Sequence, residues 1–185
     1  VDAVMAALKD RMSKTVVGNP QSEGVRMGAL VSNDQKADVL DKVRIFAGEA
    51  EQVHGDLEGF DPLDANASEG AFLPQMLFHC ADPDNAQRLH DTEAFGPVST
   101  VMGYRDLDHA ISLVNRGGGS LVTSLITHDG DVAREVVMGS AAFNGRIYIN
   151  NRDSMKEATG HGSPLPHMVH GGPGRAGGGE ELGGI

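Results

Sequence analysis

Hydrophobic positions at helical spacing open the chain. Val1, Val4 and Leu8 recur at intervals of three to four residues, which predicts an amphipathic helix. Met12 continues the same stripe, and the turn at Gly18-Asn19-Pro20 follows it. We therefore expect the first helix to cover most of the first twelve residues and to end before this turn.

A second helix is predicted after a loop of residues 21–26. Ser32 stands three residues before Gln35, an arrangement in which the serine side chain caps the helix and the glutamine reaches back toward its start. The apolar positions of its predicted buried face are Val39, Leu40, Val43 and Phe46. We expect this helix to end near Gly48.

The pattern alternates between strand and helix in the central part of the chain. Strands are predicted at 98–104, 120–127 and 145–150, and helices at 106–115 and 131–139. Strands joined by single helices are usually parallel and connected by right-handed crossovers. The fold class is therefore predicted to be α/β, a mostly parallel sheet flanked by helices.

The segments around this alternating region are less regular. Residues 48–70 are rich in polar residues and glycine, which favours a surface excursion with one short strand around 52–54. Residues 71–80 are predicted to form a strand, and 82–90 a short helix or turn. Residues 151–185 are glycine-rich and without periodic segments, so we expect a long loop packed over one end of the sheet.

The composition limits the kinds of binding partner and the cellular compartment that are expected for this protein. The net charge is -11 with no basic cluster, which argues against binding to nucleic acid. No apolar run approaches the roughly 20 residues that cross a bilayer. The single cysteine, Cys80, cannot form an internal disulfide, and no export signal is visible, so a soluble cytoplasmic protein without membrane association is expected. The acidic residues of the surface excursion are expected to form solvated faces: Glu49, Glu51, Asp56 and Glu58.

The most specific chemical signal lies just before the strand predicted at 98–104. The run Glu93-Ala94-Phe95-Gly96-Pro97-Val98 places a carboxylate and an aromatic ring beside a Gly-Pro corner. At the end of a strand, such a corner can present an acid and a flat ring to a planar heterocyclic ligand. A capped turn with a phenylalanine in the core is the alternative interpretation of the same residues.

This run resembles the Glu-x-Phe-Gly-Pro-Val signature of the aldehyde dehydrogenase superfamily, and further segments resemble the same family in the same order. They are Val17-Gly18-Asn19-Pro20 followed by 27–32, the strand at 119–125, and the glycine-rich run 178–183. The segments 158–166 and 170–184 are similar to those of semialdehyde dehydrogenases in bacterial phenylacetate catabolism. The resemblance spans nearly the whole chain.

The resemblance implies a cofactor and roles for particular residues. Glu93 stands where the family places a glutamate that binds the nicotinamide ribose, and Phe95 where a phenylalanine contacts the nicotinamide end of NADP or NAD. The catalytic residues, a nucleophilic cysteine and a general base, are expected upstream of Val1. The chain is then part of a catalytic domain, residues 1–185, and is expected to be inactive alone.

The resemblance also implies a substrate, a CoA-linked semialdehyde that is oxidised to the acid, and a homo-oligomeric assembly. Residues 151–185 correspond to the loop that borders the substrate entrance in the family. The candidates for the substrate pocket are Asn150, Thr159, His161 and His167. No metal site is expected, because glycine-spaced histidines without a nearby acid are a weak ligand set.

Two rival interpretations stay open. The first is a small complete enzyme that uses Cys80, although this cysteine lacks the family's Gly-Gln-x-Cys setting and is more typical of a buried, inert thiol. The second is a noncatalytic binding or oligomerisation module, in which an open strand edge near 145–150 would pair with another copy. The G-x-G-x-x-G match at 172–177 is interpreted as a false positive, because no strand precedes it and no helix follows.

Overall fold

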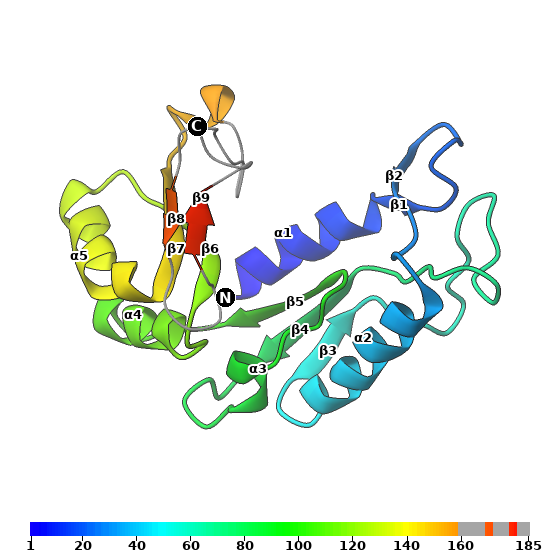
Figure 1. Cartoon of the computed structure of the whole chain (residues 1–185), viewed down its shortest axis with the longest axis horizontal. Coiled ribbons are helices and arrows are strands. Elements are labelled where there is room, and N and C mark those ends of the chain that lie inside the picture. The colour runs from blue at the N-terminus through cyan, green and yellow to red at the C-terminus, as the bar shows by residue number, and fades with distance from the viewer. Residues whose placement is uncertain (159–168, 172–177, 181–185) are drawn as a thin grey trace. The chain divides into compact units, whose positions relative to one another are not determined.

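The chain folds into two compact units, Val1–Gly103 and Tyr104–Ile185, in a computed structural model (Figure 1). The structure describes residues 1–158, 169–171 and 178–180. Helices and strands occur in both units, so the predicted α/β class is confirmed. Within the described residues, no helix is both long and apolar enough to cross a membrane.

The first unit contains three helices and five strands within its 103 described residues. The helices are α1 (Asp2–Ser13), α2 (Asn33–Phe46) and α3 (Arg88–Asp91). The strands are β1 (Val16–Val17), β2 (Val25–Met27), β3 (Glu51–His54), β4 (Met76–Cys80) and β5 (Val98–Met102). β1 pairs with β2 in parallel, while β4 lies between an antiparallel β3 and a parallel β5.

The core of this unit forms between α2 and β4. Val39, Val43 and Phe46 recur on one face of α2 and are buried, as the apolar spacing predicts. They pack with Leu73, Met76 and Phe78. The rings of Phe46 and Phe78 meet edge to face, with centroids 6.1 Å apart and planes at 88°. Helix α2 therefore covers the strand that leads toward the Glu93–Val98 run.

The start of α2 is capped as predicted. Ser32 is the residue before the helix, and its Oγ accepts a hydrogen bond from the Gln35 backbone N–H at 3.1 Å. The Gln35 side chain reaches back and accepts from the N–H of Val31, also at 3.1 Å. The helix ends at Phe46, two residues before Gly48, where the sequence placed the end.

The second unit pairs two parallel strands and places two helices against them. α4 (Leu107–Asn115) and α5 (Gly130–Ser140) lie side by side next to β6 (Ser120–Ile126) and β7 (Asn144–Asn150) (Figure 1). The register runs from Ser120 opposite Asn144 to Ile126 opposite Asn150, so both strands end together at their carboxyl ends. The remaining elements are η1 (Ala141–Phe143), η2 (Met155–Glu157), β8 (Val169–Gly171) and β9 (Gly178–Glu180).

Several details differ from the sequence prediction. In the first unit, β3 pairs with β4 in antiparallel, so only the β4–β5 pair of this sheet has the predicted parallel arrangement. β4 begins only at Met76, because the preceding Pro74 has no N–H to donate to a neighbouring strand. β2 lies partly within the predicted loop of residues 21–26, and the short helix or turn predicted at 82–90 is a turn at 83–85 followed by α3.

The carboxyl-terminal segment is only partly described. η2 and the antiparallel pair β8 and β9 lie within 151–185, so the prediction of no regular element there is wrong for these short segments. The remaining part of the predicted loop falls at 159–168, 172–177 and 181–185, outside the described residues. The G-x-G-x-x-G match at 172–177 also lies there.

Candidate functional site

The loop between α3 and β5, residues 92–97, presents the two candidate cofactor residues to solvent. Glu93 is exposed, and the Phe95 side chain is 69% exposed. Ala94 between them is partly buried and packs against the core cluster under α2. The loop therefore turns its small residue inward and its carboxylate and ring outward, which excludes a core position for Phe95.

A side chain of α2 holds the backbone of this loop. The Gln35 Nε2 group donates to the backbone oxygen of Phe95 at 2.7 Å. Because the other end of the same amide accepts from the N–H of Val31, Gln35 links the start of α2 to the loop. The Phe95 backbone is thus fixed while its ring stays uncovered.

The Gly-Pro corner, Gly96 and Pro97, also holds the loop against α2 and β4. A β-carbon on Gly96 would lie 2.8 Å from Val39 Cγ2, so only glycine allows the loop to approach α2 this closely. The carbonyl of Pro97 accepts from the N–H of Met76 at 2.8 Å, which starts the pairing between β4 and β5. The glycine at this corner is therefore explained by packing, and the backbone carbonyl of the proline takes part in strand pairing.

Glu49 holds the start of α3, the helix that precedes the loop, and was not recognised from the sequence, which assigned it to a solvated face. Its carboxylate accepts hydrogen bonds from the backbone N–H groups of Gln87, Arg88 and Leu89 at 3.0–3.1 Å. Burial raises the pKa of Glu49, but these three donors more than compensate, and the pKa lies below its ordinary value. The partners are 38–40 residues away, so no local pattern signals them.

Asn150 is the last residue of β7, and its side chain forms hydrogen bonds with residues of the turn that follows. The residue is 8% exposed. Its Oδ1 accepts from the Asn151 N–H at 2.8 Å and from Ser154 Oγ at 2.5 Å. Its backbone oxygen accepts from the Thr127 N–H at 3.0 Å, beyond the end of β6. Asn150 therefore shapes the turn at the carboxyl ends of both strands.

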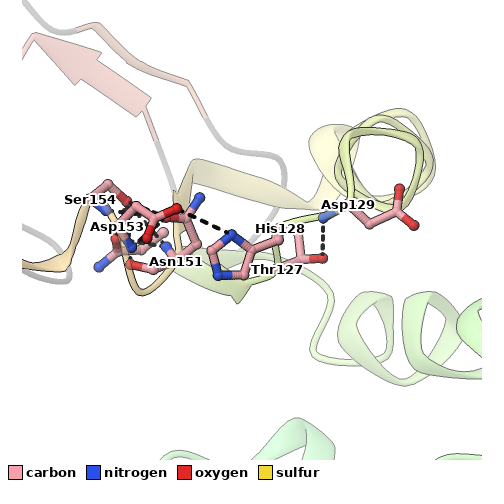
Figure 2. A network of polar contacts seen from close by, with 7 residues as sticks. Thr127, His128, Asp129, Asn151, Asp153 and Ser154 are labelled. Carbon is pink, nitrogen blue, oxygen red and sulfur yellow. Dashed lines mark hydrogen bonds and ion pairs between the residues drawn. The ribbon is translucent and has the colours of Figure 1, made fainter.

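The turn after Asn150 carries a second set of contacts (Figure 2). Asn151 Oδ1 accepts from the N–H groups of Asp153 at 3.0 Å and Ser154 at 3.1 Å. His128 Nδ1 lies 3.8 Å from a carboxylate oxygen of Asp153, and both side chains are exposed. An exposed pair at this distance contributes little to stability. The other substrate-pocket candidates, Thr159, His161 and His167, lie outside the described residues.

Cys80 ends β4 in the interior of the first unit. Its side chain is 1% exposed, so the predicted buried thiol is confirmed. His79 beside it is half-buried, and consecutive strand residues face opposite sides. A thiol in this position is closed to substrate, which argues against the interpretation of a small complete enzyme.

Comparison with known proteins identifies the family to which the sequence is related. The model of the aldehyde dehydrogenase family matches residues 1–183. The chain is 51% identical over 160 residues to the protein MaoC of Klebsiella aerogenes, covering 86% of this chain and 46% of that protein. It is 38% identical over 171 residues to 3,4-dehydroadipyl-CoA semialdehyde dehydrogenase of Aromatoleum evansii, covering 92% of this chain and 33% of that protein.

A solved structure shares the fold. Betaine aldehyde dehydrogenase of Staphylococcus aureus, determined in complex with NAD+, superposes with a TM-score of 0.79 at 22% identity. The match covers 98% of this chain and 34% of that one. The chain thus spans less than half the length of the curated relatives it matches. With a family match along nearly its whole length, the chain belongs to the aldehyde dehydrogenase family.

Proposed function

We propose that this chain is part of the catalytic domain of an NAD(P)-dependent aldehyde dehydrogenase and forms the wall that contacts the nicotinamide end of the cofactor. The observation that carries the proposal is the loop 92–97, whose backbone is anchored while Glu93 and Phe95 are exposed. A preorganised backbone with two uncovered side chains is what a ligand-contacting loop requires.

The two side chains fit such a cofactor chemically. The Glu93 carboxylate can accept hydrogen bonds from the hydroxyl groups of a ribose, and the exposed face of Phe95 can pack against a planar ring. When bound, the nicotinamide accepts the hydride that leaves the substrate. Because Gln35 and Gly96 already hold the loop in place, cofactor binding does not carry the entropy cost of ordering it.

The proposed substrate is a CoA-linked semialdehyde of phenylacetate breakdown, which is oxidised to the carboxylic acid. The similarity to a dehydrogenase named for such a substrate supports this choice. The nucleophilic cysteine and the general base are assigned to a part of the protein upstream of Val1, so the 185-residue chain has no turnover alone. The full protein is proposed to be a cytoplasmic homo-oligomer that uses NADP or NAD.

The aldehyde path is assigned to the segment that follows β7. Thr159, His161 and His167 are proposed to line it, and residues 151–185 to border its entrance. Asn150 contributes indirectly, because its side chain oxygen is already used to hold Asn151 and Ser154. Its replacement would therefore displace the start of this segment.

The test is aldehyde-dependent reduction of NADP and NAD by the full-length protein and its Glu93→Gln variant. Loss of a hydrogen bond to a charged group costs about 1.5–3 kcal/mol, so kcat/KM for the nucleotide should fall at least tenfold. Glu58→Gln removes a charge at another exposed position and serves as the control. Unchanged nucleotide kinetics in Glu93→Gln would refute the site, and absence of turnover in the full protein would favour the noncatalytic binding or oligomerisation module.

A further inference from the structure

One carboxylate from a distant part of the chain holds the start of α3. Glu49 Oε1 accepts from the N–H groups of Gln87 and Arg88 at 3.1 Å, and Oε2 accepts from Gln87 at 3.1 Å and Leu89 at 3.0 Å. These N–H groups belong to the first turn of the helix, where no carbonyl within the helix can accept them. The charge of the carboxylate also suits the positive end of the backbone dipoles.

The restraint on α3 extends to the loop that carries Glu93. The helix ends at Asp91, and the Thr92 N–H donates to the Arg88 carbonyl at 3.0 Å. Arg88 is itself held by Glu49, and Thr92 is the residue before Glu93. A continuous path of hydrogen bonds therefore joins Glu49 to the amino-terminal end of the loop.

The two ends of the loop depend on different anchors. Gln35 and the Gly96 contact with Val39 hold the side that leads to β5. On the other side, Leu89 packs against the core cluster, and Glu49 supplies the polar restraint. Because Glu93 lies nearer to α3 than to the Gly-Pro corner in the sequence, its position follows that of α3 more directly.

The Glu49 carboxylate is ionised throughout the neutral range. Burial raises its pKa and the nearby Asp91 carboxylate raises it further, but the N–H groups of Arg88, Leu89 and Gln87 lower it more. An ionised acceptor makes stronger hydrogen bonds than a neutral one. The restraint on α3 is thus present under the conditions in which a dehydrogenase is assayed.

We propose that Glu49 is a positioning residue for the nucleotide site, which fixes α3 and thereby the placement of Glu93. This inference rests on the proposed function of Glu93. Glu49 itself does not touch the cofactor in this arrangement, because its carboxylate is occupied by the backbone of α3.

The experiment is a double-mutant cycle in the full-length protein, with Glu49→Gln, Glu93→Gln and the pair. Glu49→Gln should raise KM for the nucleotide about fivefold, within the range of coupling between neighbouring residues, and leave KM for the aldehyde nearly unchanged. In the Glu93→Gln background the same change should have little further effect. Glu49→Asp keeps the charge on a shorter side chain and should give an intermediate KM, and Glu58→Gln is the control.

Each outcome bears on a different claim. Additive effects of the two substitutions, or equal rises in KM for nucleotide and aldehyde, would overturn the positioning role while leaving Glu93 in the site. If Glu93→Gln alone leaves nucleotide kinetics unchanged, the proposed function fails instead. Should Glu49→Gln not fold, the same cycle is run with Glu49→Asp, where an unchanged nucleotide KM together with faster amide exchange in residues 87–92 overturns the inference.

Discussion

Replacing Gly96 by alanine tests whether close packing of the loop on α2 explains the glycine of the signature. The added β-carbon would lie 2.8 Å from Val39 Cγ2 and 3.1 Å from Cγ1, and β-carbons essentially never approach other atoms within 3.0 Å. Val39 is 0% exposed and β-branched on a helix, so it cannot rotate away. Either the loop or α2 must therefore move.

The expected cost follows from two opposing terms. Adding a methyl group to a packed interior costs about 1–3 kcal/mol. Replacing glycine by alanine restricts the unfolded chain and returns about 0.4–1 kcal/mol. At the middle of both ranges, the free energy of unfolding of the first unit should therefore fall by about 1 kcal/mol. The nucleotide KM of the full-length protein should rise as well, because the displaced loop carries Glu93 and Phe95.

The assay is urea unfolding with amide exchange in α2 and α5 as local probes. Gly130→Ala, at the first residue of α5, is the matched control, because no atom beyond the neighbouring residues and the backbone of α5 itself lies within 4 Å of the added carbon. Its unfolding free energy should stay unchanged or rise by up to about 1 kcal/mol. In the Val39→Ala background, Gly96→Ala should cost little, since the clashing methyl groups are gone. An equal cost in both backgrounds would refute the packing explanation.

Three further predictions concern the unfolding free energy, the stability of helix α5 and the accessibility of the Cys80 thiol. Glu49→Gln should lower the unfolding free energy by about 1 kcal/mol at neutral pH, which is the contribution of a typical helix cap. The pKa of Glu49 in the folded protein lies below its ordinary value of 4.5, so the difference between the two proteins should be complete above pH 4.5 and vanish as the pH falls through the folded pKa. Urea titrations at several pH values test this. Asp129→Ala should cost about 1 kcal/mol in α5, measured by amide exchange, because Asp129 accepts from the N–H groups of Asp131 and Val132. Cys80 should react with a thiol reagent only after unfolding, and rapid labelling of the native chain would contradict its burial.

Local patterns predicted the elements that depend on neighbouring residues. The capping pair Ser32 and Gln35 marked the start of α2, and the alternation after residue 98 predicted β6, α5 and β7 within one or two residues. These elements can be predicted because helix caps and periodic apolar faces depend on residues that lie only a few positions apart in the sequence. The parallel pairing of β6 with β7 followed from the single helix between them.

The contacts that build the candidate site could not be predicted from local sequence patterns. Gln35 reaches Phe95 across 60 residues, and Glu49 reaches Leu89 across 40. Each of these side chains had a sufficient local explanation, Gln35 as part of a cap and Glu49 as one of several surface acids. Pairing over such separations depends on how α2 packs on β4, which no short window contains.

The Glu93–Val98 run combines positions that serve the fold with positions that do not. Ala94 and Gly96 pack against the core, and Pro97 joins the pairing of β4 with β5. Glu93 and Phe95 are exposed, and a phenylalanine side chain that is 69% exposed adds little to the stability of this part of the chain. Since packing and strand pairing involve the residues beside them, the acid and the ring are the two positions of the run that the fold alone does not explain, as the proposed cofactor site requires.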